Sequence, residues 1–417
     1  MNTERLLARF LRYVSVDTTA NDTTDDYPSS EGQFELGRLL VDELKQMGIH
    51  EVSQNDRGIV LATMPGNTKH EAPTVVLNSH LDTSPETTGK NVNPQVIRDY
   101  RGGDIALPNE QNQIIRVAEN PELNQLIGCT LITTDGTTLL GGDDKAGLAI
   151  IMESIQSLGE QPDILHGPIR VAFTCDEEIG RGVDHVDVPS LNAAACYTLD
   201  GPGAGRIDVE TFSADLATIT IRGINIHPSI AKGRMVNAIK AGAALIDRLP
   251  STHLSPETTS EREGFLHPYS FDGGVGEVTL RILIRDFDTP KLSAHAAMLN
   301  KLAEEVKREF PGTEFDLQLS AQYRNLADGL AIEPRAAGFA EEAFRRLNLP
   351  CQRSIIRGGT DGSRFTELGL PTPNLSSGQH NPHSILEWAC LDEMAQAVQV
   401  NLELFQVWAE TQAEPKK

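Results

Sequence analysis

Cysteine is scarce in this chain. Its five cysteines, Cys129, Cys175, Cys196, Cys351 and Cys390, are spread over 417 residues, odd in number and never arranged as a C-x-x-C pair. This pattern predicts neither a disulfide framework nor a zinc site built from thiolates. We interpret the cysteines as free thiols of a protein in a reducing compartment.

Basic residues and long apolar runs are lacking as well. The chain has 36 lysines and arginines against 59 aspartates and glutamates, which gives a formal net charge of −23. Such a surface repels phosphate backbones and anionic lipids, so we expect neither nucleic acid nor membrane as a partner. No apolar run is long enough to span a bilayer, and the first 17 residues have the pattern of an amphipathic helix, not of a signal peptide. We therefore expect a cytoplasmic protein.

The length and the order of the segments indicate two domains. A chain of 417 residues exceeds what one hydrophobic core usually organises. Apolar segments alternate with helical patterns at first, which is typical of an α/β sheet with parallel strand pairs. From about residue 208 the order becomes strand, helix, two strands, helix and strand, as in a ferredoxin-like βαββαβ domain. We predict a discontinuous α/β domain over residues 1–207 and 323–417, with a mixed, largely parallel sheet flanked by helices, and an inserted domain over residues 208–322.

Three acidic residues stand side by side in the segment RVAFTCDEEIGRG, residues 170–182. The segment begins with apolar residues and then presents Asp176, Glu177 and Glu178. Neighbouring carboxylates raise one another's pKa and destabilise the fold unless a cation lies among them. Taken alone, the three acids are typical of a solvated loop. A metal site is the alternative, and it requires ligands from elsewhere in the chain.

Other apolar segments also end in possible metal ligands. The segments TVVLNSHLD, LLGGDDKAG, CYTLDG and SSGQHNPHSILEW supply His80, Asp82, Asp143, Asp144, Asp200, His380, His383 and Glu387. Each segment alone has an ordinary structural explanation, such as a helix N-terminus or a turn. Because the carboxyl ends of parallel strands meet at one edge of a sheet, the segments together predict a cluster of imidazoles and carboxylates. Nitrogen and oxygen donors without thiolate suit two ions of Zn²⁺, Mn²⁺ or Co²⁺.

Eight motifs, in order along essentially the whole chain, resemble a known family. They are SHLDTSPETTGKNV, LLGGDDKAG, FTCDEEIGRG, YTLDG, GINIHPSIAKGRMVNA, LIRDFD, IRGGTDGSRF, and PTPNL followed by NPH. The family is that of zinc-dependent exopeptidases and deacylases, and HLDTSPETTGKN and IRGGTDG resemble its aminotripeptidases. The resemblance implies two Zn²⁺ per chain, with Mn²⁺ or Co²⁺ as alternatives, and small peptides as substrates. The sequence leaves both a monomer and a homodimer open.

The resemblance also implies two metal-ligand sets that share one aspartate. The sets are His80, Asp143 and Asp200 for one ion, and Asp143, Glu178 and His383 for the other. Asp82 would orient the His80 imidazole through its second ring nitrogen, and Glu177 remains as the general base. His380 lies three residues before His383 and is the competing ligand.

Three further residues are candidates for substrate binding. His227 resembles a histidine of the family's lid that reaches over the metals, although its own surroundings indicate an ordinary loop. Arg285 and Arg357 each suit a peptide's terminal carboxylate, because a guanidinium forms two parallel hydrogen bonds to it. A structural ion pair is the alternative for each arginine. The resemblance further makes the inserted domain a lid that closes over the substrate, and it implies a cis peptide bond between Asp143 and Asp144.

The function implied by these residues is that of a metal-dependent aminotripeptidase. It would remove the N-terminal residue of a tripeptide, with a water molecule shared by two metal ions and Glu177 as the general base. A dipeptidase, a carboxypeptidase or an N-acyl-amino-acid deacylase with the same metal chemistry is the alternative. A metal-free binding protein is disfavoured because every ligand is present. A barrel-type amidohydrolase would require His-x-His where this chain has His80-x-Asp82.

Overall fold

The chain folds as two compact units. The computed structural model describes residues 1–109 and 113–413. The first unit comprises Met1–Val209, Leu326–Ser354 and the residues from Thr360 onward, and the second comprises Glu210–Asn325 and Ile355–Gly359. The second unit is therefore inserted into the first, and it includes the segment 355–359, which our sequence analysis places with the first domain.

A mixed sheet of 11 strands forms the centre of the first unit. Its order is β1 (Glu51–Gln54), β2 (Val60–Met64), β8 (Ile169–Thr174), β3 (Val75–His80), β9 (Ala195–Pro202), β16 (Asn374–His380), β17 (Trp388–Cys390), β7 (Leu131–Thr133) and β4 (Gln95–Ile97), with β10 (Arg206–Thr211) and β15 (Gln352–Ile356) beside this row. The four middle strands, β8, β3, β9 and β16, are parallel to their neighbours in this group. The remaining strands of the row pair antiparallel. The expected α/β fold with a parallel centre is confirmed.

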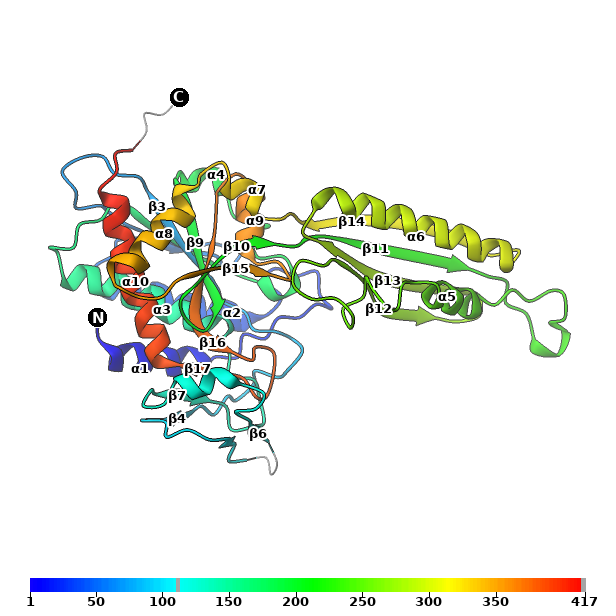
Figure 1. Cartoon of the computed structure of the whole chain (residues 1–417), viewed down its shortest axis with the longest axis horizontal. Helices are drawn as coiled ribbons and strands as arrows, with labels where there is room; N and C mark the ends of the chain where they lie inside the picture. The colour runs from blue at the N-terminus through cyan, green and yellow to red at the C-terminus, as the bar shows by residue number, and fades with distance from the viewer. Residues whose placement is uncertain (110–112, 414–417) are drawn as a thin grey trace. The chain divides into compact units, whose positions relative to one another are not determined.

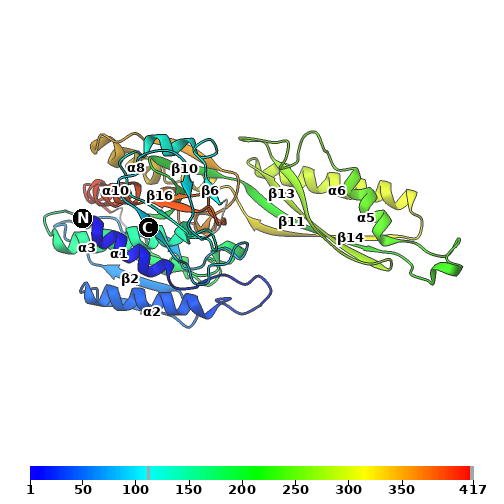
Figure 2. The ribbon, with the colours of Figure 1, turned by 90° about the horizontal axis from the view of Figure 1, so that it is seen from below.

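Helices cover both faces of this sheet (Figures 1 and 2). One face packs against α1 (Thr3–Val14), α2 (Glu31–Gln46), α3 (Gly142–Glu160), α8 (Arg335–Arg346) and α10 (Leu391–Ala409). The other face packs against α4 (Val188–Leu191) and α9 (Asp361–Glu367). Neighbouring residues of β3 show why both faces are apolar: Leu77 belongs to the first core and Val76 to the second, because side chains alternate along a strand.

The second unit is a ferredoxin-like domain, as the sequence predicts. Its elements are β11 (Ser213–Arg222), α5 (Ala238–Asp247), β12 (Phe265–Gly273), β13 (Glu277–Asp286), α6 (Thr289–Glu309) and β14 (Glu314–Tyr323). The strands form an antiparallel sheet in the order β12, β13, β11, β14. The apolar faces of α5 and α6 pack on this sheet, and α6 runs along it (Figure 1).

A small satellite of structure separates β3 from α3 in the chain. It contains β4, β7, the short strands β5 (Ile105–Ala106) and β6 (Ile114–Ile115), and the 3₁₀ helix η1 (Pro121–Gln125). Tyr100, Leu123 and Trp388 are among the side chains of its own apolar core. Among the helices of the described residues, none has the length and apolar character needed to cross a membrane.

Candidate metal centre

The predicted ligands follow or end the parallel strands of the first unit. His80 is the last residue of β3, and Glu178 follows the end of β8. Asp200 lies near the end of β9, and His383 lies three residues beyond β16. Asp143 comes from the turn that opens α3. Because the four strands are parallel, their carboxyl ends bring these side chains to one edge of the sheet.

Two groups of three donors meet at Asp143. Atoms of His80, Asp143 and Asp200 lie within 4.8 Å of one another, and so do atoms of Asp143, Glu178 and His383. Oδ1 of Asp143 is 2.9 Å from Nε2 of His80, and Oδ2 is 3.4 Å from Nε2 of His383. Asp143 therefore presents one oxygen to each histidine, as a bridging carboxylate does. The peptide bond between Asp143 and Asp144 is cis, as expected.

The electrostatics of the cluster fit divalent cations. Burial raises the pKa of Asp200, and the neighbouring Asp143 carboxylate raises it further. Burial also raises the pKa of Glu178 to about 7, again with Asp143 contributing. Among the described residues, Oε1 of Glu178 is buried without a hydrogen-bond partner. Cations among these oxygens would relieve the repulsion and satisfy the unpaired atom, and imidazole and carboxylate donors suit Zn²⁺, Mn²⁺ or Co²⁺.

Asp82 connects the two halves of the site. Its fully buried carboxylate places Oδ1 3.4 Å from Nδ1 of His80. The same carboxylate accepts hydrogen bonds from the main-chain N–H groups of Glu177 and Glu178, each at 3.0 Å. Nδ1 of His80 also lies 3.1 Å from the main-chain carbonyl oxygen of Asp82. Asp82 thus holds the histidine ring with its main chain and its carboxylate, and the carboxylate holds the turn that carries the two glutamates.

The adjacent glutamates differ in their surroundings. Both lie in the 3₁₀ turn η2 (Glu177–Ile179), which follows Asp176 in a left-handed conformation with φ of 60°. Glu178 places Oε2 2.9 Å from Nε2 of His383, whereas no metal-ligand group includes Glu177 among the residues that the structure describes. Burial raises the pKa of the Glu177 carboxyl well above its usual value. Our prediction that Glu177 handles the proton is compatible with this position.

His380 and His383 have different surroundings in the structure. The His380 ring stacks on Trp388 at a centroid distance of 3.7 Å, and its Nε2 is 2.7 Å from Oε2 of Glu393. His383 lies beside Asp143 and Glu178 instead. His380 therefore has the contacts of a structural histidine.

Two more carboxylates lie at the site; our sequence analysis counts Glu387 among the possible metal ligands and does not name Glu86. Glu387, 1% exposed, accepts main-chain hydrogen bonds from Leu140 at 2.7 Å, from Gly141 at 2.8 Å and from Asp143 at 3.1 Å. It holds the turn that presents Asp143. Glu86 places Oε2 3.3 Å from Nδ1 of His383. In the sequence, Glu86 could be identified by its place in the motif HLDTSPETTGKN. The only feature that pointed to Glu387 was its nearness to the loop histidines.

The three substrate-binding candidates belong to the second unit. Arg357 donates hydrogen bonds to the carbonyls of Glu261 and Glu263 and to Oγ1 of Thr259, all at 2.9–3.0 Å. Among the described residues Arg285 forms one long hydrogen bond, 3.5 Å, from Nη1 to the Arg357 carbonyl, and its guanidinium lies over the Phe265 ring at 5.8 Å from the centroid. Its Nε is buried without a partner among the described residues.

His227, the third candidate, is exposed in the loop after β11. Its Nδ1 lies 2.7 Å from the hydroxyl of Ser229 and also accepts the Ser229 main-chain N–H. The ring therefore has one nitrogen engaged locally, and Nε2 is the atom that could bind another group.

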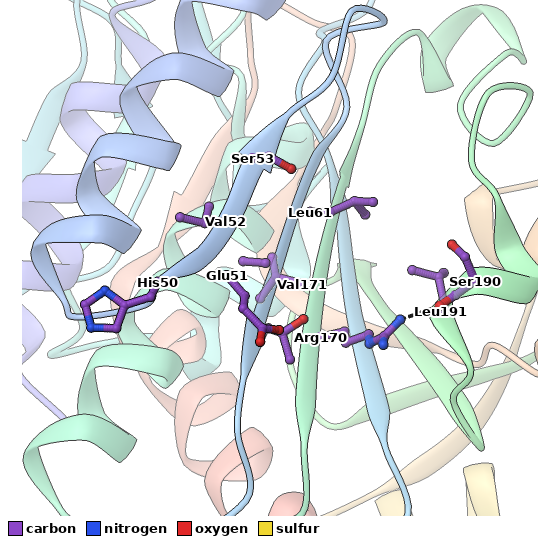
Figure 3. A pocket seen from close by; sticks show the side chains of 11 residues that line it. His50, Glu51, Val52, Ser53, Leu61, Arg170, Val171, Ser190 and Leu191 are labelled. Atoms are coloured by element: carbon purple, nitrogen blue, oxygen red, sulfur yellow. Dashed lines mark hydrogen bonds between the residues drawn. The ribbon is translucent and has the colours of Figure 1, made fainter.

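A separate surface cavity of about 400 Å³ lies on the first unit (Figure 3). It is lined by residues of β1, β2 and β8 and includes Arg170, which hydrogen-bonds the Ser190 carbonyl. Arg170 stands near the start of β8, whereas Glu177 and Glu178 follow its end. The cavity is thus at the opposite end of the strand from the candidate metal centre, and none of the predicted site residues lines it.

The fold and the donor set define a candidate two-metal hydrolase with an inserted ferredoxin-like domain. Comparison with known proteins agrees with this class: the peptidase dimerisation domain (M20_dimer) matches residues 209–314. Peptidase T of Geobacillus thermodenitrificans (strain NG80-2) is 43% identical over 97% of this chain and 98% of its own. The chain belongs to the peptidase T family, so the resemblance seen in its motifs is confirmed.

Solved structures have the same fold. The aminopeptidase PepT from Bacillus cereus ATCC 10987 is 25% identical, with a TM-score of 0.75 over 98% of this chain and 99% of its own. A tripeptidase from Staphylococcus aureus subsp. aureus mu50 is also 25% identical, with a TM-score of 0.76 over 99% of this chain and 100% of its own. Each match covers both units of this chain.

Proposed function

We propose that the chain is a metal-dependent aminotripeptidase that removes the N-terminal residue of tripeptides. The observation that carries the proposal is the pair of three-donor groups that share Asp143. Glu177 interacts electrostatically with His80 and Glu178 of these groups. Family membership supports it, since the similar structures are those of an aminopeptidase and a tripeptidase. The acidic cluster would attract the free ammonium group of a peptide.

The metal content we propose is two Zn²⁺ per chain, with Mn²⁺ or Co²⁺ as alternatives. His80, Asp143 and Asp200 would hold one ion, and Asp143, Glu178 and His383 the other. When bound, the ions would polarise the scissile carbonyl and lower the pKa of the attacking water. Asp82 would keep His80 oriented through Nδ1, which fixes Nε2 as the ligand atom.

Glu177 would take the proton from the attacking water and pass it to the leaving amine. Its position supports this role, because Asp82 holds its main chain at 3.0 Å while its neighbour Glu178 faces His383. The two adjacent glutamates would thus divide proton transfer and metal binding between them.

Substrate recognition would depend on the second unit, acting as the lid. Arg285 is the better candidate for the terminal carboxylate of the peptide, because its Nε has no partner among the described residues. Arg357 has three hydrogen bonds within its own unit, so we assign it the support of the segment 259–263. His227 would use its free ring nitrogen to stabilise the developing oxyanion.

We further propose that two copies assemble through the second unit, whose residues 209–314 match the peptidase dimerisation domain. The protein would break down small peptides in the cytoplasm. Analytical ultracentrifugation of the full chain tests the dimer, and a monomer at micromolar concentration would contradict it.

A peptide panel read by mass spectrometry tests the activity. The panel contains one tripeptide with a free amino terminus, its N-acetylated form, its amide, and the related di- and tetrapeptides, each with and without a chelator. We expect the free tripeptide alone to lose its first residue at a high rate, and only without chelator. Preferred cleavage of the dipeptide, loss of the last residue, or release of acetate would instead indicate a dipeptidase, a carboxypeptidase or a deacylase.

A further inference from the structure

Cys129, Cys390 and Asp392 form another cluster of metal-ligating side chains in the first unit. Their two Sγ atoms and one carboxylate oxygen lie within 4.8 Å of one another. The strand register explains the cluster, because Cys390 of β17 pairs directly with Leu131 of β7. Cys129 lies two residues before Leu131, in the bend that leads into β7, and this brings it next to Cys390. None of the three belongs to the donor groups around Asp143.

The surroundings of these donors suit an ion that enters from solvent. Cys390 is buried in the satellite core, Cys129 is half-buried, and Asp392 is exposed in the first turn of α10. Oδ2 of Asp392 accepts a 2.7 Å hydrogen bond from the Thr130 main chain, which fixes the carboxylate. Burial raises the pKa of both thiols, so both are protonated until a cation replaces the protons.

We propose that Cys129, Cys390 and Asp392 form a further metal site, separate from the two-ion centre at Asp143. It would hold one thiophilic divalent cation such as Zn²⁺. Binding replaces the two S–H protons, which pass to solvent, and forms two thiolate bonds and one carboxylate bond. Thiolates select soft and borderline cations. The donors around Asp143 are nitrogen and oxygen only, so the two sites differ in chemistry. Cys390 also stands three residues from Glu387, which holds the Asp143 turn, so an ion here would brace the strand beside the catalytic centre.

Cadmium is the probe that distinguishes the two sites. Thiolate-to-Cd²⁺ charge transfer absorbs in the near ultraviolet, and only a site with sulfur ligands produces it. The full chain, as purified with its own metals, is titrated with Cd²⁺. We expect a saturable band at about one Cd²⁺ per chain that Cys129→Ser abolishes. Asp392→Asn should weaken Cd²⁺ binding by at least about tenfold, since even partners outside the ligand shell contribute that much.

Cys351→Ser is the matched control, because Cys351 is an exposed cysteine outside the cluster. This variant should keep the full band. The absence of a band, a full band in Cys129→Ser, or its loss in Cys351→Ser would overturn the proposal. Cys129→Ser is the deciding variant because Cys129 is only half-buried. Cys390→Ser would also remove a side chain from the core and disturb the fold.

Discussion

Replacement of Glu387 by glutamine tests whether a buried carboxylate holds the bridging aspartate in place. The Glu387 carboxylate accepts three main-chain hydrogen bonds, two at Oε2 from Leu140 and Gly141 and one at Oε1 from Asp143. Glutamine has the same size but presents one carbonyl oxygen and one NH₂ group. Its oxygen can keep the pair at Leu140 and Gly141, and its NH₂ then faces the N–H of Asp143.

Two opposing terms set the effect of Glu387→Gln on stability. An unpaired buried donor at Asp143 costs about 1–3 kcal/mol. Burial also raises the pKa of Glu387 to about 7, so ionising it in the folded state carries a cost that glutamine avoids. We therefore expect a net loss of only about 1 kcal/mol in the free energy of unfolding. The loosened turn should mainly change the position of the Asp143 carboxylate. Metal affinity should therefore fall about 10–100-fold.

The assay measures metal content and rate separately. Glu387→Gln is dialysed against buffers of defined free Zn²⁺, its metal content is measured by mass spectrometry, and kcat is measured with and without excess metal. Glu393→Gln is the matched control, because it makes the same substitution beside His380 without touching the Asp143 turn. Wild-type metal content and kcat in Glu387→Gln, or equal losses in Glu393→Gln, would refute the reasoning.

Three further predictions concern the candidate metal centre and the arginines of the second unit. Glu177→Gln should keep both metals and lose about 10²–10⁴-fold in kcat, the usual size of a general acid–base contribution; loss of a metal ion from this variant would contradict the assignment. Asp82→Asn should lower metal affinity about 10–100-fold, whereas Glu86→Gln should have a smaller effect because Glu86 is 71% exposed. Zinc titrations of the two variants compare their losses of metal affinity. Equal losses would show that the burial of the carboxylate does not determine the size of the effect. Arg285→Ala should lower kcat/KM for a tripeptide by at least about tenfold without changing kcat/KM for the tripeptide amide. Arg357→Ala should instead lower the melting temperature, because it breaks three internal hydrogen bonds. A selective loss of tripeptide turnover in this variant would show that Arg357, and not Arg285, binds the terminal carboxylate.

Much of the candidate site could be predicted from the sequence because its pattern is local. Apolar segments that end in His80, Glu178 and Asp200 indicate strand ends, and parallel pairing brings strand ends to one edge regardless of side-chain detail. The same reasoning applies to the inserted domain, whose order of strands and helices is enough to specify a ferredoxin-like topology. Motif resemblance supplied what spacing alone left open, namely which of the carboxylates are expected to be ligands.

Tertiary structure decided the matters that depend on contacts between distant segments. The motif resemblance favours His383 over His380 as the ligand, and the stacking of His380 on Trp388 and its contact with Glu393 are compatible with that choice. Arg285 and Arg357 likewise differ through their partners, since Arg357 is hydrogen-bonded to residues about a hundred positions earlier. The scattered cysteines indicated no metal site in the sequence, yet the pairing of β17 with β7 brings two of them together. Strand register and side-chain packing bring together residues hundreds of positions apart, and no local pattern specifies them.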